Sequence, residues 1–597
     1  MNATSLFASD KHSFAQPQVA LVTHLDLNLA VDFEEKLITG IATYTIQKKS
    51  NADDILFDTS NLIINKVELN AETEASFSLG PEQPFLGRPL IIKITPTTEK
   101  VTIYYQTSPQ ATALQWLNPA QTGGKIYPFL FTQSQAILAR SWLPCQDSPG
   151  IRFTYRATVQ VPTQFVALMS ADNPIVKNKN GEYSFTQNNP IPSYLMALAV
   201  GDLVYEALDN RTGIYAEPQQ LAPAVKEFAE LPAMLKTAEA IYGNYKWNRY
   251  DLLLLPPSFP FGGMENPQLT FVTPTIIAGD QSLTSLVAHE LAHSWSGNLV
   301  TNATWNDFWL NEGFTVYFER RIMEALHGKD YADMLKVLGI TDLEHTLQEL
   351  GYTSPDTHLK LNLDGRNPDE GLTEIAYEKG NYFLLALEEA YGRTAFDNFV
   401  RKYFSDHAFR AMNTKNFLLY LKENLLNLPT VNPVLKVNPE EWLYQPGLPA
   451  AKPTLQSELF NKVIAAVNIW EENQDTANLP TQNWSTHEWL FFLHQIELTL
   501  TKAKMQDLDR HFNLTHSGNA EIQTIWFQQA IQLSYEPAYA VLEEFLNRVG
   551  RRKFLVPLYK ALQQHNNNWA KQIYARARPN YHAVATSTLD DLLHYKV

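Results

Sequence analysis

The spacing of apolar residues changes about a third of the way along the chain, and this change limits the folds that the chain can adopt. Between Leu25 and Phe33 apolar and polar residues alternate, and the run 38–46 alternates again after a polar turn. Alternation buries one face of a strand, so the two runs predict a β-hairpin. The run 153–161 repeats the pattern. We therefore predict an antiparallel β domain over residues 1–205.

The remainder of the chain is dominated by helical spacing. Helical spacing appears from residue 224 onward, one apolar strand is expected at 251–255, and helices are expected to dominate from residue 281 to about 428. Prolines then interrupt the pattern, and helix follows helix toward residue 597. The fold class predicted is multidomain α+β. Besides the β domain, we predict a middle domain over 206–444, a proline-rich linker over 445–454, and a C-terminal all-α domain, a layer of helices, over 455–597.

Charge and composition exclude several classes of function. Lys and Arg number 47 against 63 Asp and Glu, a net charge of −16, which disfavours binding to nucleic acid or to an anionic membrane. The only cysteine is Cys145, so no intrachain disulfide can form. Residues 1–18 contain no secretory signal pattern, and no apolar run is long enough to cross a bilayer. We expect a cytoplasmic protein that acts as a monomer, although the sequence does not fix the oligomeric state.

The motif His289-Glu290-Leu-Ala-His293 carries the strongest chemical signal. It lies in an apolar segment, 282–296, that predicts a helix closed by a glycine and an asparagine. Histidines one turn apart project from the same face and can share a metal ion. Glu290 points about 100° away around the helix, so it can lie beside the metal as a general base. The alternative is a buried helix whose histidines bind no metal.

A third metal ligand and a supporting carboxylate follow in the next predicted helix. Glu312 comes after eighteen intervening residues, and a zinc hydrolase needs such a third ligand. Glu319 lies seven residues later, two turns along the same face. There it could accept a hydrogen bond from the outer nitrogen of a ligating histidine. Taken alone, Glu319 would be interpreted as a solvated helix charge.

Upstream, the segment Phe261-Gly262-Gly263-Met264-Glu265 predicts a peptide-binding edge. Two glycines allow the backbone to approach a substrate, which can then bind as an added strand. Glu265 offers a carboxylate that could pair with a free α-ammonium group. The alternative is a plain turn followed by an exposed glutamate.

Together, these motifs and their spacing resemble the zinc aminopeptidase family that includes aminopeptidase N and the bifunctional leukotriene hydrolase. The resemblance implies a thermolysin-like catalytic domain with one zinc ion per chain, held by His289, His293 and Glu312. It also implies that Glu290 is the base and that Tyr377 stabilises the oxyanion.

The resemblance is closest to the leukotriene hydrolase branch. The chain lacks room for the extra β domain of aminopeptidase N, and the segments 133–137 and 550–554 resemble that branch's glutamine loop and basic carboxylate-binding motif. Glu265 and Gln135 match the pair that binds the amine, and Asp369 matches an aspartate of the substrate pocket. The substrate-binding residues implied are Gln133, Gln135, Pro260, Phe261, Gly262, Gly263, Met264, Glu265, Asp369, Arg551, Arg552 and Lys553.

The activity implied is removal of the first residue from short peptides with a free N-terminus. Two departures concern lipid substrates: Phe261 and Leu372 stand where the leukotriene enzyme has tyrosines. They put any lipid-epoxide side activity in doubt and leave the peptide chemistry untouched. A thermolysin-like endopeptidase and a catalytically inactive binding scaffold are two competing functions. The first gives no role to Glu265, and the second usually lacks a ligand or the base.

Overall fold

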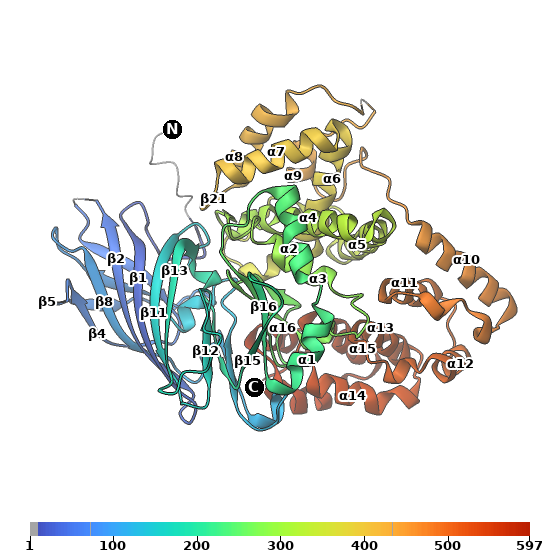
Figure 1. Ribbon diagram of the computed structural model, residues 1–597, viewed down its shortest axis with the longest axis horizontal. Helices are drawn as coiled ribbons and strands as arrows, with labels where there is room; N and C mark the ends of the chain where they lie inside the picture. Colours follow the sequence, from blue (N-terminus) through green and yellow to red (C-terminus); the bar gives the residue numbers. More distant parts are fainter. Residues whose placement is uncertain (1–9, 50, 72, 433, 597) are drawn as a thin grey trace.

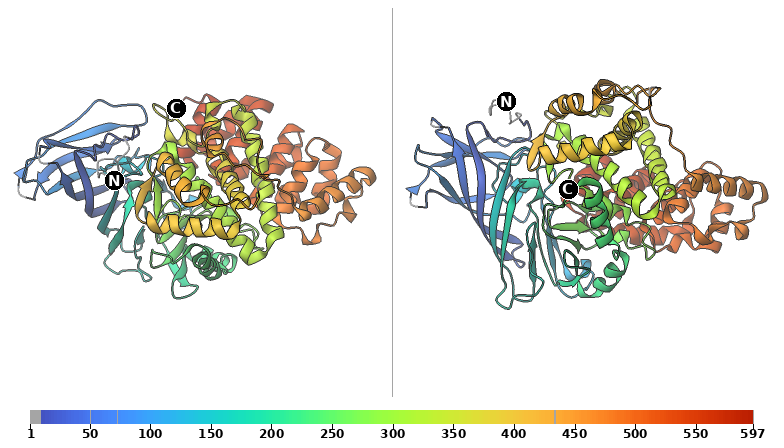
Figure 2. Two further views of the ribbon diagram at one scale, coloured as in Figure 1. Left: turned by 90° about the horizontal axis from the view of Figure 1, so that it is seen from above. Right: turned by 45° about the horizontal axis from the view of Figure 1, so that its top comes forward.

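The computed structural model describes residues 10–49, 51–71, 73–432 and 434–596. Figure 1 shows β-sheets at one end, helices of the C-terminal part at the other, and a mixed part between them. The views in Figure 2 keep this order and show the end of the chain returning toward the centre. There Gln115 Nε2 donates to Asn580 O at 3.1 Å, so the first and last parts of the chain touch.

The N-terminal part is built on a seven-stranded sheet with the order β13-β11-β1-β2-β8-β4-β5. The predicted hairpin is confirmed as β1 and β2, which pair antiparallel. The sheet is not wholly antiparallel as predicted, because β1 and β11 pair in parallel. Such a pair needs a long crossover, which the intervening strands supply. The bounds are β1 (Ala20–Asp32), β2 (Leu37–Lys48), β4 (Ile63–Leu69), β5 (Thr73–Glu74), β8 (Lys100–Gln106), β11 (Arg152–Gln160) and β13 (Glu182–Pro192).

Two smaller sheets complete this part. The order β3-β7-β6 forms one, and β12-β14-β10-β9 forms the other. Side chains such as Leu25 and Leu27 on the inner face of β1 are buried, as the alternation predicted. The bounds are β3 (Asp54–Thr59), β6 (Phe77–Leu79), β7 (Arg88–Lys93), β9 (Leu114–Leu117), β10 (Phe129–Thr132), β12 (Val166–Met169) and β14 (Leu198–Gly201).

The middle part contains a five-stranded sheet, where only one strand was predicted. Its order is β15-β16-β17-β19-β18, and β17 covers most of the predicted strand. The other strands have two to five residues, too few to display alternation. The bounds are β15 (Val204–Ala207), β16 (Thr212–Ala216), β17 (Tyr250–Leu254), β18 (Gly263–Met264) and β19 (Leu269–Val272); β20 (Val300–Asn302) and β21 (Arg410–Met412) form a separate pair.

Nine α-helices accompany this sheet within the described residues. The metal-motif helix α3 is shorter than the predicted 282–296, because the amides of Ser294 and Trp295 bond back three residues rather than four. The bounds are α1 (Pro218–Glu227), α2 (Leu231–Tyr242), α3 (Ser285–Ala292), α4 (Trp309–His327), α5 (Lys329–Leu350), α6 (Gly380–Tyr391), α7 (Arg393–Asp406), α8 (Thr414–Leu421) and α9 (Pro439–Tyr444).

The C-terminal part is all-helical, as predicted, and has its own hydrophobic core. The N-terminal and middle parts share one continuous core instead. Residues 445–457 carry no helix or strand. The bounds are α10 (Glu458–Asn473), α11 (Thr486–Ile496), α12 (Lys502–Phe512), α13 (Ala520–Gln532), α14 (Tyr539–Arg548), α15 (Arg552–Ala577) and α16 (Ala583–Leu593). The domain boundaries at 205, 444 and 454 stay predictions.

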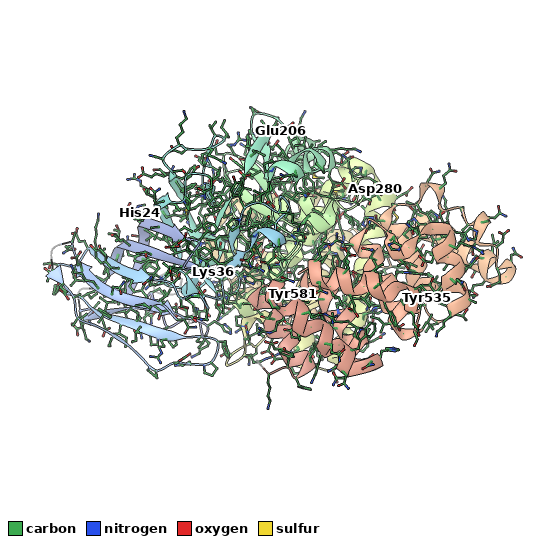
Figure 3. All side chains as sticks on the ribbon, turned by 90° about the horizontal axis from the view of Figure 1, so that it is seen from below. His24, Lys36, Glu206, Asp280, Tyr535 and Tyr581 are labelled. Carbon is green, nitrogen blue, oxygen red and sulfur yellow. The ribbon has the colours of Figure 1, made fainter. Side chains whose placement is uncertain are left out.

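Figure 3 places Asp280 where the middle part meets the C-terminal helices. Nearby, Ser282 Oγ and Thr486 Oγ1 lie 2.6 Å apart across that border. In the described part of the chain, every helix is too short or too polar to cross a membrane.

Candidate active site

Three predicted metal ligands converge where α3 packs on α4. Nε2 of His289 lies 3.4 Å from Oε2 of Glu312, and Nε2 of His293 lies 3.5 Å from the same oxygen. One donor atom from each residue falls within 4.8 Å of the others. The helical spacing of the motif therefore does bring both imidazoles to one side, facing the carboxylate of the next helix.

The outer nitrogen of each histidine is held by a neighbour, which leaves Nε2 free for a ligand. Nδ1 of His289 lies 3.2 Å from Oε2 of Glu319, the carboxylate that was expected two turns beyond Glu312. Nδ1 of His293 lies 2.9 Å from Oδ1 of Asn311, with Thr315 Oγ1 at 3.1 Å. Sequence reasoning missed these last two residues, whose only signal was their position beside Glu312 on the same helix.

This donor set fits a zinc ion. Glu312 is 2 % exposed, and its Oε2 has no hydrogen-bond partner among the described residues. Two imidazole nitrogens and one carboxylate oxygen are the ligands of many catalytic zinc sites. Burial lowers the pKa of His289, but the carboxylates of Glu312 and Glu319 raise it further, to well above its usual value. The surroundings therefore favour a positive charge at this point.

Glu290 lies on the other side of the ligand set, against the strand β18. It is 5 % exposed, and its Oε2 has no partner among the described residues. A Cβ built on Gly263 would lie 2.3 Å from Glu290 Oε1. Burial raises the pKa of Glu290 well above that of a solvated carboxyl. A cation at the adjacent ligand set would oppose this shift and keep Glu290 ionised.

The strand β18 forms one edge of the five-stranded sheet, as a peptide-binding strand must. Beyond it, Glu265 is 3 % exposed and its Oε1 has no partner among the described residues. Atoms of Glu265, Glu290 and His293 lie within 4.8 Å of one another. The backbone oxygen of Glu265 accepts a hydrogen bond from Asn298 Nδ2 at 2.7 Å. This bond holds the backbone of Glu265 next to the metal ligands.

Tyr377 faces the same space from a π-helical turn, Ile375–Lys379. Its ring centroid lies 6.1 Å from that of His289. The turn is anchored by Glu378, which accepts two hydrogen bonds from Arg320 at 2.6 and 2.7 Å. Insertions of this kind in helices are frequent at functional sites. Burial raises the pKa of Tyr377 well above its usual value, so the hydroxyl keeps its proton and can donate it.

These elements and the C-terminal helices line one cavity of about 740 Å³. Most of the predicted site residues line it: Gln135, Pro260, Phe261, Gly262, Gly263, Glu265, His289, Glu290, His293, Glu312, Glu319, Tyr377, Arg551, Arg552 and Lys553. Three do not. Gln133 and Met264 are buried behind the wall, where Gln133 Nε2 lies 3.3 Å from the sulfur of Met264. Asp369 lies near Arg552, which opposes the rise of its pKa on burial.

The C-terminal helices supply the basic end of the cavity. Arg551 Nη1 lies 3.0 Å from Glu521 Oε1, and Lys553 Nζ lies 3.3 Å from the other oxygen of the same carboxylate. Arg551 also donates to Thr275 Oγ1 at 3.2 Å. Sequence reasoning identified both cations but missed Glu521, which lies thirty residues upstream of Arg551 without a motif of its own.

Comparisons with known proteins cover nearly the whole chain. Residues 228–438 match the Peptidase family M1 domain, 22–195 the Peptidase M1 N-terminal domain, and 484–593 the leukotriene A4 hydrolase C-terminal domain. The chain is 39 % identical to leukotriene A-4 hydrolase of Xenopus laevis, over 93 % of this chain and 94 % of that one. It is 35 % identical to leucine aminopeptidase 2 of Sclerotinia sclerotiorum, over 95 % and 96 %. A structure of yeast LTA4 hydrolase in complex with bestatin superposes with a TM-score of 0.90 at 32 % identity, covering 98 % of this chain and 97 % of that one.

Proposed function

Since the chain belongs to peptidase family M1, in the branch of leukotriene A4 hydrolase and leucine aminopeptidase 2, we propose that it cleaves the first residue from short peptides at a single zinc site. The observation that carries the proposal is the place of Glu265. A buried carboxylate with an unpartnered oxygen lies within 4.8 Å of Glu290 and His293. A peptide ammonium group bound there would hold the first peptide bond beside the metal ligands.

The zinc ion held by His289, His293 and Glu312 would supply Lewis-acid chemistry and lower the pKa of a bound water. Glu290 takes a proton from the attacking water and later gives it to the leaving amine nitrogen. A C–O bond forms and the C–N bond breaks, so atoms and protons balance. Tyr377 donates a hydrogen bond from its hydroxyl group to the carbonyl oxygen as negative charge develops there.

Glu265 and Gln135 bind the free ammonium group, and the edge of β18 binds the peptide backbone. This anchoring favours an exopeptidase over the thermolysin-like endopeptidase, because an endopeptidase has no use for a buried carboxylate at this position. An inactive scaffold is disfavoured because the base and all three ligands are present and converge. We also predict that the other site residues named from the sequence bind substrate. A cytoplasmic location and a monomeric state are further predictions.

A side activity on lipid epoxides is a second candidate, favoured by the 39 % identity to a leukotriene hydrolase. Phe261 and Leu372 line the cavity without the hydroxyl groups that tyrosines would offer there. We therefore place peptide hydrolysis first.

The proposal is tested by the variant Glu290→Gln, which keeps the size of the side chain and removes the base. We expect zinc content to remain at one per chain while kcat for an aminoacyl anilide falls at least about 10²-fold. Chelation should abolish activity in the wild type, and added zinc should restore it. Loss of zinc from Glu290→Gln would make Glu290 a ligand, and cleavage of N-acetylated peptides at the rate of free ones would contradict the role of Glu265.

A further inference from the structure

The part of the cavity between Tyr377 and Arg551 contains more acid than the proposed mechanism uses. Glu374 lies three residues before Tyr377, at the start of the same π-helical turn. Asp342 lies opposite on α5, and both side chains line the cavity. Neither residue touches the metal ligands or takes part in proton transfer.

Three of the four lysine and arginine side chains that line the cavity are already engaged, and the fourth, Arg552, lies near Asp369. Both Nη atoms of Arg320 donate to Glu378, and Arg551 and Lys553 share Glu521. Within the described residues, Glu374 and Asp342 have neither an ion pair nor a side-chain hydrogen bond at contact distance. Lys553 is near enough to both carboxylates to act on their pKa values. Arg320 also acts on the pKa of Glu374, and His345 on that of Asp342, so the two carboxyl groups lie near cations but contact none of them in the described part of the chain.

The pKa of Glu374 indicates that its carboxyl group lacks a cation in direct contact. Burial and the negative charges of Asp342 and Glu378 together raise the pKa of Glu374 to about 8, although Lys553 and Arg320 oppose them. Two carboxyl groups without a contact partner among the described residues therefore fit a positively charged group brought in by the substrate, whose charge would favour their ionised form.

The expected position of a bound peptide indicates which of its groups would carry this positive charge. If Glu265 binds the amine and Arg551 the carboxylate of a tripeptide, its second residue lies between Tyr377 and Arg551, since an extended chain advances about 3.3 Å per residue. Leu338 lies one turn before Asp342 on α5 and also lines the cavity. An apolar surface next to a carboxylate suits the aliphatic stem and charged head of a lysine or arginine.

Resting on the proposed aminopeptidase function, we propose that Glu374, with Asp342, selects peptides whose second residue is lysine or arginine. Glu374 is thus a specificity-determining residue on the leaving-group side of the scissile bond. The charged head of the substrate side chain lies between the two carboxylates, and its stem lies along Leu338.

The test compares kcat/KM for the tripeptides Ala-Lys-Ala and Ala-norleucine-Ala, which share the stem and differ in charge. We expect the wild type to prefer lysine at least about tenfold, as a charge-assisted contact provides. In Glu374→Gln the preference should fall to within about threefold, while the norleucine peptide is cleaved at nearly the wild-type rate. Asp342→Asn should reduce the preference in the same direction.

Matched controls separate this contact from the general negative charge of the protein. Glu182→Gln, in an exposed position on β13, should leave the lysine preference unchanged. Ala-Ala-Lys, with its cation one residue further along, should respond less to Glu374→Gln than Ala-Lys-Ala does. A wild type without lysine preference, or a preference that survives Glu374→Gln, overturns the inference. In both cases cleavage of Ala-norleucine-Ala shows that the aminopeptidase function itself still holds.

Discussion

At the scale of single residues, Gly263 gains a role from the structure that the sequence alone did not assign. The paired glycines predicted close approach of a substrate backbone. In the structure the absent Cβ of Gly263 is also what makes room for Glu290, because a Cβ there would lie 2.3 Å from Oε1. The position of the proposed base therefore depends on this glycine.

We expect Gly263→Ala to lower kcat about 10- to 10²-fold, because the added methyl group displaces Glu290 from the attacking water. Zinc content should be unchanged, since the three atoms nearest to the added methyl group all belong to Glu290 and not to a metal ligand. Gly518→Ala is the matched control, because a Cβ at Gly518 has no neighbour within 4 Å. Wild-type kcat in Gly263→Ala would show that Glu290 adjusts freely and is not held by β18.

At the scale of elements, the π-helical turn that carries Tyr377 is held by a buried lysine. Lys379 is 0 % exposed, and its Nζ donates to the backbone oxygens of Thr357 at 2.6 Å and Gln445 at 3.1 Å. Carbonyl oxygens satisfy the donors but supply no full negative charge. Burial therefore lowers the pKa of Lys379 to about 7.

This shift makes stability depend on pH. Between pH 7 and the usual lysine pKa of about 10.4, the unfolded chain binds a proton at Lys379 that the folded protein does not. The contribution of Lys379 to the free energy of unfolding therefore increases as pH rises through this window. It decreases again as pH falls toward 7. We expect the difference in thermal midpoint between wild type and Lys379→Met to grow from about pH 7 to pH 10 in favour of the wild type.

Lys415→Met serves as the control because it removes a lysine in an exposed position on α8, and its difference from the wild type should change less over the same pH range than that of Lys379→Met. A constant difference for Lys379→Met would mean that Lys379 stays charged in the folded protein.

At the scale of the whole molecule, the substrate cavity belongs to no single part of the chain. Gln135 comes from the N-terminal part, Glu265 and the metal ligands from the middle part, and Arg551 from the start of the C-terminal helix α15. The C-terminal helices have a separate core, so their cations reach the cavity only because the parts pack against one another.

Arg551→Ala should therefore affect substrates according to length. We expect kcat/KM for tripeptides to fall about tenfold or more, because their terminal carboxylate loses a charged partner. Single aminoacyl anilides carry no such carboxylate and should change by less than about threefold. Arg548→Ala, exposed on α14, should affect neither class. An equal loss for both classes would show that Arg551 only supports the shape of the cavity.

The sequence by itself determined the elements whose information is local. Helical repeat places His289 and His293 on one face, and the same repeat places Glu319 two turns beyond Glu312, so these relations could be predicted from spacing. Alternation likewise predicted β1 and β2. The family resemblance added Tyr377, which no spacing rule connects with the histidines.

Only the tertiary structure decided the relations between segments far apart in the sequence. The parallel pairing of β1 with β11, the five-stranded sheet and the partnership of Glu521 with Arg551 had no local pattern to predict them. The same is true of Glu374 and Asp342, which become a pair because α5 packs beside the π-helical turn. Periodicity records which face of an element is buried, whereas packing determines which other element covers that face.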